Sequence, residues 1–80
     1  MADTTDQTVV GSSCMFYRRQ SGGVLLKNKC AEEMTFAVTQ KGSGGSDNIT
    51  NNITVGAKKE TIHNTGGSEN VVSVGIGSKT

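Results

Sequence analysis

The two cysteines are the residues whose spacing indicates chemistry most directly. Cys14 and Cys30 are equidistant from Gly22, which lies in the turn-forming triplet 21–23 between two apolar-rich runs. If a three-residue loop is centred there, the cysteines lie directly opposite each other on antiparallel strands. Their Cα atoms would then be about 4.5–5.5 Å apart, a separation that a disulfide spans. We therefore predict a hairpin closed by a Cys14–Cys30 disulfide; two reduced, buried thiols in a cytosolic protein are the alternative.

Patterns typical of catalysis or metal binding are absent from the sequence. His63 is the only histidine, and a metal would need it together with both cysteines as thiolates, which is fewer than the four ligands of a structural zinc site. Glu32 and Glu33 are adjacent, so on a strand they would point to opposite faces. No Gly-x-Ser-x-Gly motif occurs, and the glycine clusters lack the Gly-Lys-Ser/Thr ending of a phosphate-binding loop. We expect no catalysis, no metal and no cofactor.

Basic residues gather on one predicted sheet face. The same hairpin register places Tyr17 opposite Lys27, with Arg19 and Lys29 on the same side. The segment 14–41 holds five basic residues against two acidic ones, while the whole chain is only +1. Such a face is typical of binding to an acidic protein surface or an anionic glycan. A solvated face whose lysines protect an edge strand is the alternative, and a sequence pI of about 7.8 disfavours nucleic acid.

Alternating and β-branched segments separated by glycine-rich turns predict an all-β fold. Six strands are expected, at residues 14–20, 24–30, 34–40, 49–55, 60–63 and 71–76. Short strands at this spacing are typical of a small six-stranded antiparallel β-sandwich or barrel. We expect residues 1–13 to form a polar N-terminal arm, with Val9-Val10 as its pairing segment, and residues 14–80 to form a single domain. Residues 41–47 are expected to form a flexible loop, whose Gly42–Ser46 stretch resembles a laboratory linker but is also found in natural loops.

One predicted sheet face is apolar. The hairpin, together with pairing of residues 24–30 with residues 34–40, would place these residues on that face: Cys14, Phe16, Val24, Leu26, Cys30, Met34, Phe36 and Val38. Asn28 is the one polar residue among them, and it needs a hydrogen-bond partner if it is buried.

Two segments match the N-glycosylation sequon, beginning at Asn48 and at Asn52. In a chain this rich in asparagine and threonine, such matches arise easily by chance. They matter only for a secreted eukaryotic protein, and Asn52 would point outward if Ile53 is in the core.

The composition leaves little material for a core. The chain has 80 residues, of which 32% are hydrophobic, and it has no tryptophan. A domain of this size is marginal on its core alone, so a disulfide worth about 3 kcal/mol or burial in an oligomer would stabilise it. The low net charge and the grouped apolar residues favour a folded domain over a disordered chain. No apolar run approaches the roughly 20 residues of a membrane span.

These features predict a non-catalytic binding module, secreted or exposed at a cell or virion surface. It would recognise a protein, or else an anionic glycan, through Tyr17, Arg19, Lys27 and Lys29. The polar, acidic start is no signal peptide, and a cytoplasmic location is the alternative. The rival function is a structural or assembly protein, such as a small virion component, that forms homo-oligomers through edge strands or the Val9-Val10 arm.

Overall fold

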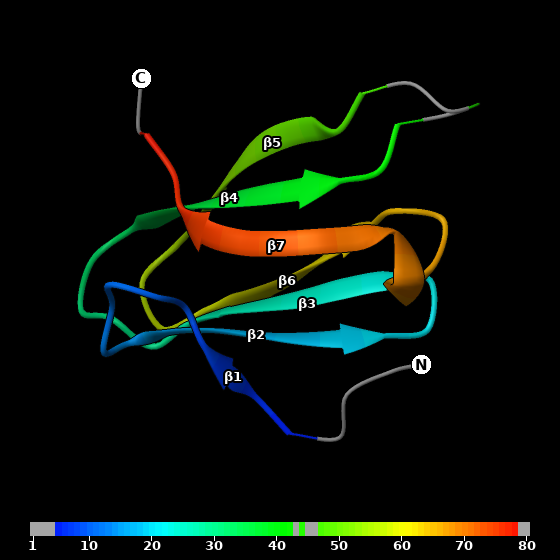
Figure 1. Ribbon diagram of the computed structural model, residues 1–80. Coiled ribbons are helices and arrows are strands. Elements are labelled where there is room, and N and C mark those ends of the chain that lie inside the picture. The colour runs from blue at the N-terminus through cyan, green and yellow to red at the C-terminus, as the bar shows by residue number, and fades with distance from the viewer. Residues whose placement is uncertain (1–4, 43, 45–46, 79–80) are drawn as a thin grey trace.

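A computed structural model describes residues 5–42, 44 and 47–78. In this part of the chain the fold is an antiparallel β-sandwich of two sheets (Figure 1). The first sheet has the order β1 (Gln7–Thr8), β2 (Met15–Gln20), β3 (Gly23–Asn28) and β6 (Glu60–Asn64). The second sheet has the order β5 (Ile49–Val55), β4 (Met34–Gln40) and β7 (Val71–Ile76), and the short 3-10 helix η2 (Ser68–Asn70) leads into β7.

The predicted all-β sandwich with one disulfide is confirmed. All six predicted strands are present, and β4, β5 and β7 have the predicted bounds. The predicted polar arm contains an additional strand, β1, which pairs with β2. This strand is formed by Gln7–Thr8 and not by the predicted segment Val9-Val10, because Val9 is fully buried in the core and Val10 is exposed. Three residues of the predicted flexible loop, Ser43, Gly45 and Ser46, lie outside the described part of the chain.

The register of the β2–β3 hairpin differs by one residue from the predicted one. Gln20 pairs with Gly23, so the loop has two residues rather than three, and Gly22 carries the left-handed φ of +85°. Gly23 belongs to β3 because it also pairs with Asn64 of β6. A Cβ at Gly23 would overlap the carbonyl oxygen of His63, so glycine is needed there for the close approach of two strands. Gly23 therefore allows β3 and β6 to pack closely and is not part of the turn.

The predicted pairing of residues 24–30 with residues 34–40 is wrong. β3 pairs with β2 and β6, whereas β4 pairs with β5 and β7 in the other sheet. The segment 29–33 therefore crosses from one sheet to the other instead of forming a hairpin. Because both strands still contribute side chains to the core between the two sheets, most of the predicted apolar face does lie in the core.

The core fills the space between the two sheets. It contains these buried residues: Val9, Met15, Val24, Leu26, Cys30, Phe36, Val38, Val55, Val71 and Val74. Phe16 is absent from this set because the one-residue shift in register turns it to the other face of its sheet. Met15, fully buried, and Tyr17, packed against the core, take its place.

Asn28 is buried among these residues, with 1% of its surface exposed, and its polar atoms are paired as expected. Its Nδ2 lies within hydrogen-bond distance of the carbonyl oxygens of Glu32 (2.9 Å), Val55 (2.9 Å) and Gly56 (3.1 Å). Its Oδ1 accepts a hydrogen bond from the Cys30 backbone N–H at 2.9 Å. The Asn28 side chain thus joins β3 to the crossover and to the end of β5.

The Cys14–Cys30 disulfide forms as predicted, with 5.0 Å between the Cα atoms. The ladder itself does not bring the cysteines opposite each other, because the Lys29 backbone N–H donates to the Cys14 carbonyl oxygen. Cys30 reaches Cys14 only because β3 ends at Asn28 and the chain turns. The disulfide therefore fastens the start of the crossover to the start of β2.

Candidate functional site

The four residues predicted to form a binding face divide between the two faces of the first sheet. Tyr17 pairs with Leu26, which is fully buried, so Tyr17 and Arg19 lie on the face toward the core. Lys27 pairs with Phe16 on the opposite, outer face, and Lys29 lies on that side as well, with its Nζ 5.1 Å from the centre of the Phe16 ring. The structure therefore brings together Lys27 and Lys29 but separates them from Tyr17 and Arg19.

Tyr17 and Arg19 form a pair of their own at the margin of the core. The Tyr17 side chain is half-buried and packs against the core, and the Arg19 guanidinium lies 5.6 Å from the centre of its ring. A cation over an aromatic ring at this distance is attracted by the ring quadrupole. These contacts assign Tyr17 mainly to packing.

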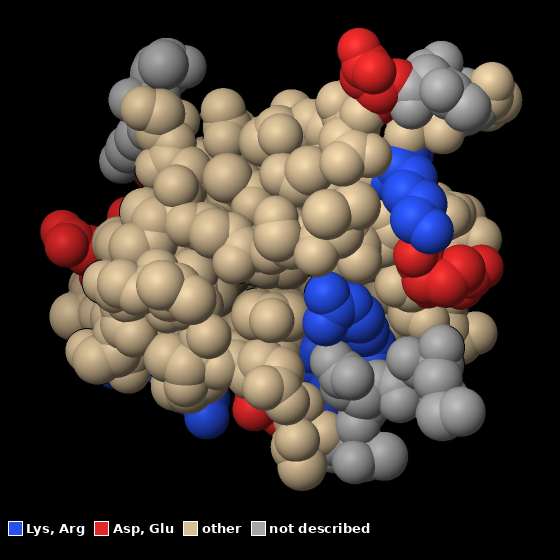
Figure 2. Space-filling model, viewed as in Figure 1, with Lys and Arg blue, Asp and Glu red and all other residues tan. Residues whose placement is uncertain are grey.

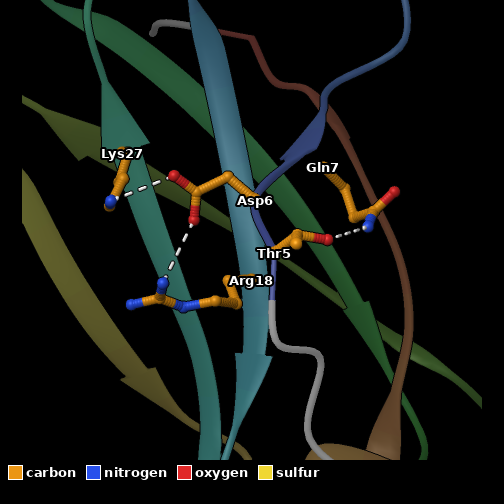
Figure 3. A network of polar contacts seen from close by, with 5 residues as sticks. All are labelled: Thr5, Asp6, Gln7, Arg18 and Lys27. Atoms are coloured by element: carbon orange, nitrogen blue, oxygen red, sulfur yellow. Dashed lines mark hydrogen bonds and ion pairs between the residues drawn. The ribbon is translucent and has the colours of Figure 1, made fainter.

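On the outer face, the aspartate that precedes β1 neutralises two basic side chains. Asp6 Oδ2 accepts a hydrogen bond from Lys27 Nζ at 3.0 Å, and Asp6 Oδ1 lies 3.5 Å from Arg18 Nη1. Figure 3 shows the Asp6 carboxylate between the two side chains, with one oxygen toward each. The hydrogen bond from Lys27 holds the pKa of Asp6 below its ordinary value, and the positive charge of the nearby basic residues acts in the same direction. This network attaches β1 to the outer face of β2 and β3.

Two further lysines join Lys27 and Lys29 from the turn between β5 and β6. Lys58 and Lys59 lie beside the end of β3, and together the four lysines, with Asn28 and Glu60, line a shallow pocket of about 220 Å³. We call this the lysine pocket. The sequence identified its first two members only, since the other two were assigned to a turn whose neighbour in space was unknown.

Backbone and side-chain hydrogen bonds fix the turn that carries Lys58 and Lys59. The Asn28 backbone N–H donates to the Lys59 carbonyl oxygen at 2.9 Å, and the Lys59 N–H donates to the Gly56 carbonyl oxygen at 3.2 Å. Lys58 Nζ donates to the Lys29 carbonyl oxygen at 3.0 Å. The second of these bonds closes the turn, and the other two hold it against the end of β3 and bring its lysines beside Lys29.

The lysine pocket carries an excess of positive charge. Lys27 is paired with Asp6, and Glu60 is the one carboxylate that lines the pocket. None of the described carboxylates lies within ion-pair distance of the other three pocket lysines, all of which are exposed: Lys29, Lys58 and Lys59. Several ammonium groups with few counter-charges make a local site for a negatively charged ligand.

The other residues considered for chemistry have structural partners. His63 Nε2 lies 3.0 Å from Gln40 Oε1, and both cysteines are in the disulfide. Within the described ranges, no group of three or more His, Cys, Asp or Glu side chains is placed to hold a metal ion. No helix in the described residues has the length and apolar character needed to cross a membrane. Asn48 and Asn52 are both exposed, and their glycosylation stays a prediction.

We compared the chain with protein-family models, with curated proteins and with solved structures, and no match was found in any of the three comparisons.

Proposed function

We propose that this chain is a non-catalytic binding module that recognises a protein partner through the outer face of the first sheet. The observation that supports this most is the convergence of four lysines on one pocket, beside the ring of Phe16. An aromatic side chain supplies rigid apolar contact area, and surrounding charge raises the association rate and helps to select the partner. Phe16 takes the role that the sequence suggested for Tyr17.

An acidic segment is the part of a protein that this face would bind. Because Asp6 neutralises Lys27 and Arg18, the uncompensated charge is concentrated in the lysine pocket rather than spread across the sheet. A compact basic site suits a short acidic segment, whereas nucleic acid is normally met by a basic stripe that follows its phosphates. The disulfide supports an oxidising location, secreted or at a surface, for this encounter.

The proposal is tested by titrating an oligoglutamate peptide into the ¹⁵N-labelled protein. We expect amide shifts at Phe16, Lys29 and Lys59. A Lys59→Glu variant should bind about three- to tenfold more weakly, because an attractive charge becomes a repulsive one at a solvated site. Lys41→Glu is the matched control, since Lys41 is also exposed but lies outside the pocket.

Equal weakening in both variants would show that only net charge matters and would overturn the proposed face. Binding of a heparin fragment in the lysine pocket, with no binding of the peptide, would replace the protein partner by an anionic glycan.

A second candidate function, self-assembly through a sheet edge, is favoured by the surface over β7. This strand lies at the edge of the second sheet and contains no charged residue. Val72 and Ile76 are 42% and 47% exposed, and Val10 in the β1–β2 connection is 87% exposed. Figure 2 shows this side of the molecule as a broad surface with few charged side chains. An uncharged apolar edge can pair with a strand of a second copy.

Size-exclusion chromatography with light scattering separates the two functions. An oligomer that is dissociated by Ile76→Lys but not by Lys59→Glu would support assembly through β7. A monomer at high concentration would eliminate it and leave the binding module.

A further inference from the structure

Lys58 is in a backbone conformation that lysine adopts only at a cost. It is the only described non-glycine residue with a positive φ, at +60°. The Lys59 N–H to Gly56 carbonyl hydrogen bond makes residues 56–59 a β-turn, with Lys58 at its third position. A positive φ at the third position is the mark of a type II turn, which favours glycine or asparagine there. Strained residues of this kind concentrate at functional sites.

The left-handed conformation places the Lys58 ammonium group beside those of the other pocket lysines. Lys58 Nζ is held at 3.0 Å by the Lys29 carbonyl oxygen, next to the residue whose own Nζ lies over Phe16. Lys59 follows directly and lines the same pocket. Three ammonium groups with no described carboxylate partner are thereby attached to one hydrogen-bonded junction of β3 with the β5–β6 turn.

The chemistry of lysine indicates which anion such a site prefers. A planar carboxylate is matched best by the two-pronged guanidinium of arginine, and arginine is absent from the residues that line the pocket. Lysine ammonium groups are compact point charges, each with three donors in a freely rotating arrangement. Several of them approaching from different strands can surround a tetrahedral group whose charge is spread over several oxygens.

We propose that the lysine pocket binds a tetrahedral oxyanion, the sulfate or phosphate ester group of a larger ligand. Lys29, Lys58 and Lys59 supply the positive charge, and Phe16 offers an apolar contact to the part of the ligand that carries the ester. This inference rests on the proposed function only in that both use the same face: a carboxylate segment would be held there by charge alone, whereas a tetrahedral oxyanion also suits the arrangement of the ammonium groups.

The test uses ¹⁵N-labelled protein titrated with sodium sulfate and, separately, with sodium phosphate. Sodium chloride at equal ionic strength is the reference. We expect saturable amide shifts at Asn28, Lys29 and residues 57–60 with either oxyanion but not with chloride. Lys58→Gly should raise the Kd about three- to fivefold, since one exposed charge contact is lost and the turn conformation is kept. Lys41→Gln, which removes a lysine outside the pocket, should leave the Kd unchanged.

The stronger of the two probes identifies the ester. A phosphate site should also bind inorganic phosphate more tightly from pH 6 to pH 8, because phosphate loses its second proton within this range and gains a negative charge, while sulfate binding should change little. Shifts equal to those with chloride, or equal Kd values for Lys58→Gly and Lys41→Gln, would overturn the proposal. Binding of the oxyanions without binding of the oligoglutamate peptide would contradict the proposed protein partner and support the oxyanion site. Binding of the peptide without binding of the oxyanions would contradict the oxyanion site alone.

Discussion

Removing the Asn28 amide should destabilise the protein strongly, although the residue is polar. Its Nδ2 has two hydrogens for the three carbonyl oxygens at 2.9, 2.9 and 3.1 Å, and its Oδ1 accepts one N–H. Three hydrogen bonds at about 1 kcal/mol each give a loss of about 3 kcal/mol for Asn28→Ala. A chain of this length has a total stability of about 4–12 kcal/mol. Urea denaturation followed by circular dichroism measures the change.

Two further variants make this prediction specific. Asn52→Ala removes an exposed asparagine of β5 and should change the stability by less than about 0.5 kcal/mol. Asn28→Asp keeps the shape but directs a carboxylate oxygen at carbonyl oxygens, so burial and repulsion raise the pKa of the new carboxyl. Relative to wild type, this variant should be least stable at neutral pH and should recover as pH falls and the carboxyl is protonated. A loss below about 1 kcal/mol for Asn28→Ala would refute the role assigned to this amide network.

Three other predictions follow from named contacts. Lys58→Gly should be more stable than Lys58→Ala by about 0.5–1 kcal/mol, because relief of about 1–2 kcal/mol of left-handed backbone strain exceeds the entropic cost of glycine. Lys59→Gly should instead be less stable than Lys59→Ala, and thermal melts of the four variants measure both differences. Gly23→Ala should lose about 1–3 kcal/mol in urea denaturation, because the new Cβ overlaps the His63 carbonyl oxygen, and an unchanged midpoint would contradict the β3–β6 pairing. Asp6→Asn should accelerate amide hydrogen exchange in β1. In wild type, the pKa of the Asp6 carboxyl is lowered, so protection of β1 should persist above about pH 4 and should be lost as pH falls through the folded-state pKa. Protection factors that do not change with pH would contradict the role of Asp6.

The strands could be predicted from the sequence because their signals are local. In β4 the large apolar residues Met34, Phe36 and Val38 alternate with small or polar ones, and β7 is a short run rich in valine, so both appear with the predicted bounds. The disulfide was also predictable because one cysteine lies at each open end of a single hairpin, although the register places Cys14 opposite Lys29 rather than Cys30. The buried position of Asn28 and its need for hydrogen-bond partners were predictable because alternation along the strand places it on the same face as Val24 and Leu26.

The partners of each strand could not be predicted in the same way. Pairing of β3 with β6 joins segments far apart in the chain, and no local pattern encodes it. The lysine pocket depends on that pairing, because it places the β5–β6 turn beside Lys29. Lys58 and Lys59 therefore read as an ordinary polar turn in the sequence. The left-handed conformation of Lys58 is likewise visible only in the structure.

The one-residue error in register has a particular cause in the sequence of β2. This strand reads Met-Phe-Tyr-Arg-Arg-Gln, so Phe16 and Tyr17, and then Arg18 and Arg19, are near-equivalent neighbours. A shift by one residue exchanges the members of each pair between the faces and leaves one aromatic and one arginine on both. Alternation therefore cannot set the phase of β2, and the choice is made by Gly23, which must lie inside β3. The outer face keeps an aromatic residue beside Lys27 and Lys29 in either register, which is why a basic and aromatic face was predictable although the identity of its aromatic residue was not.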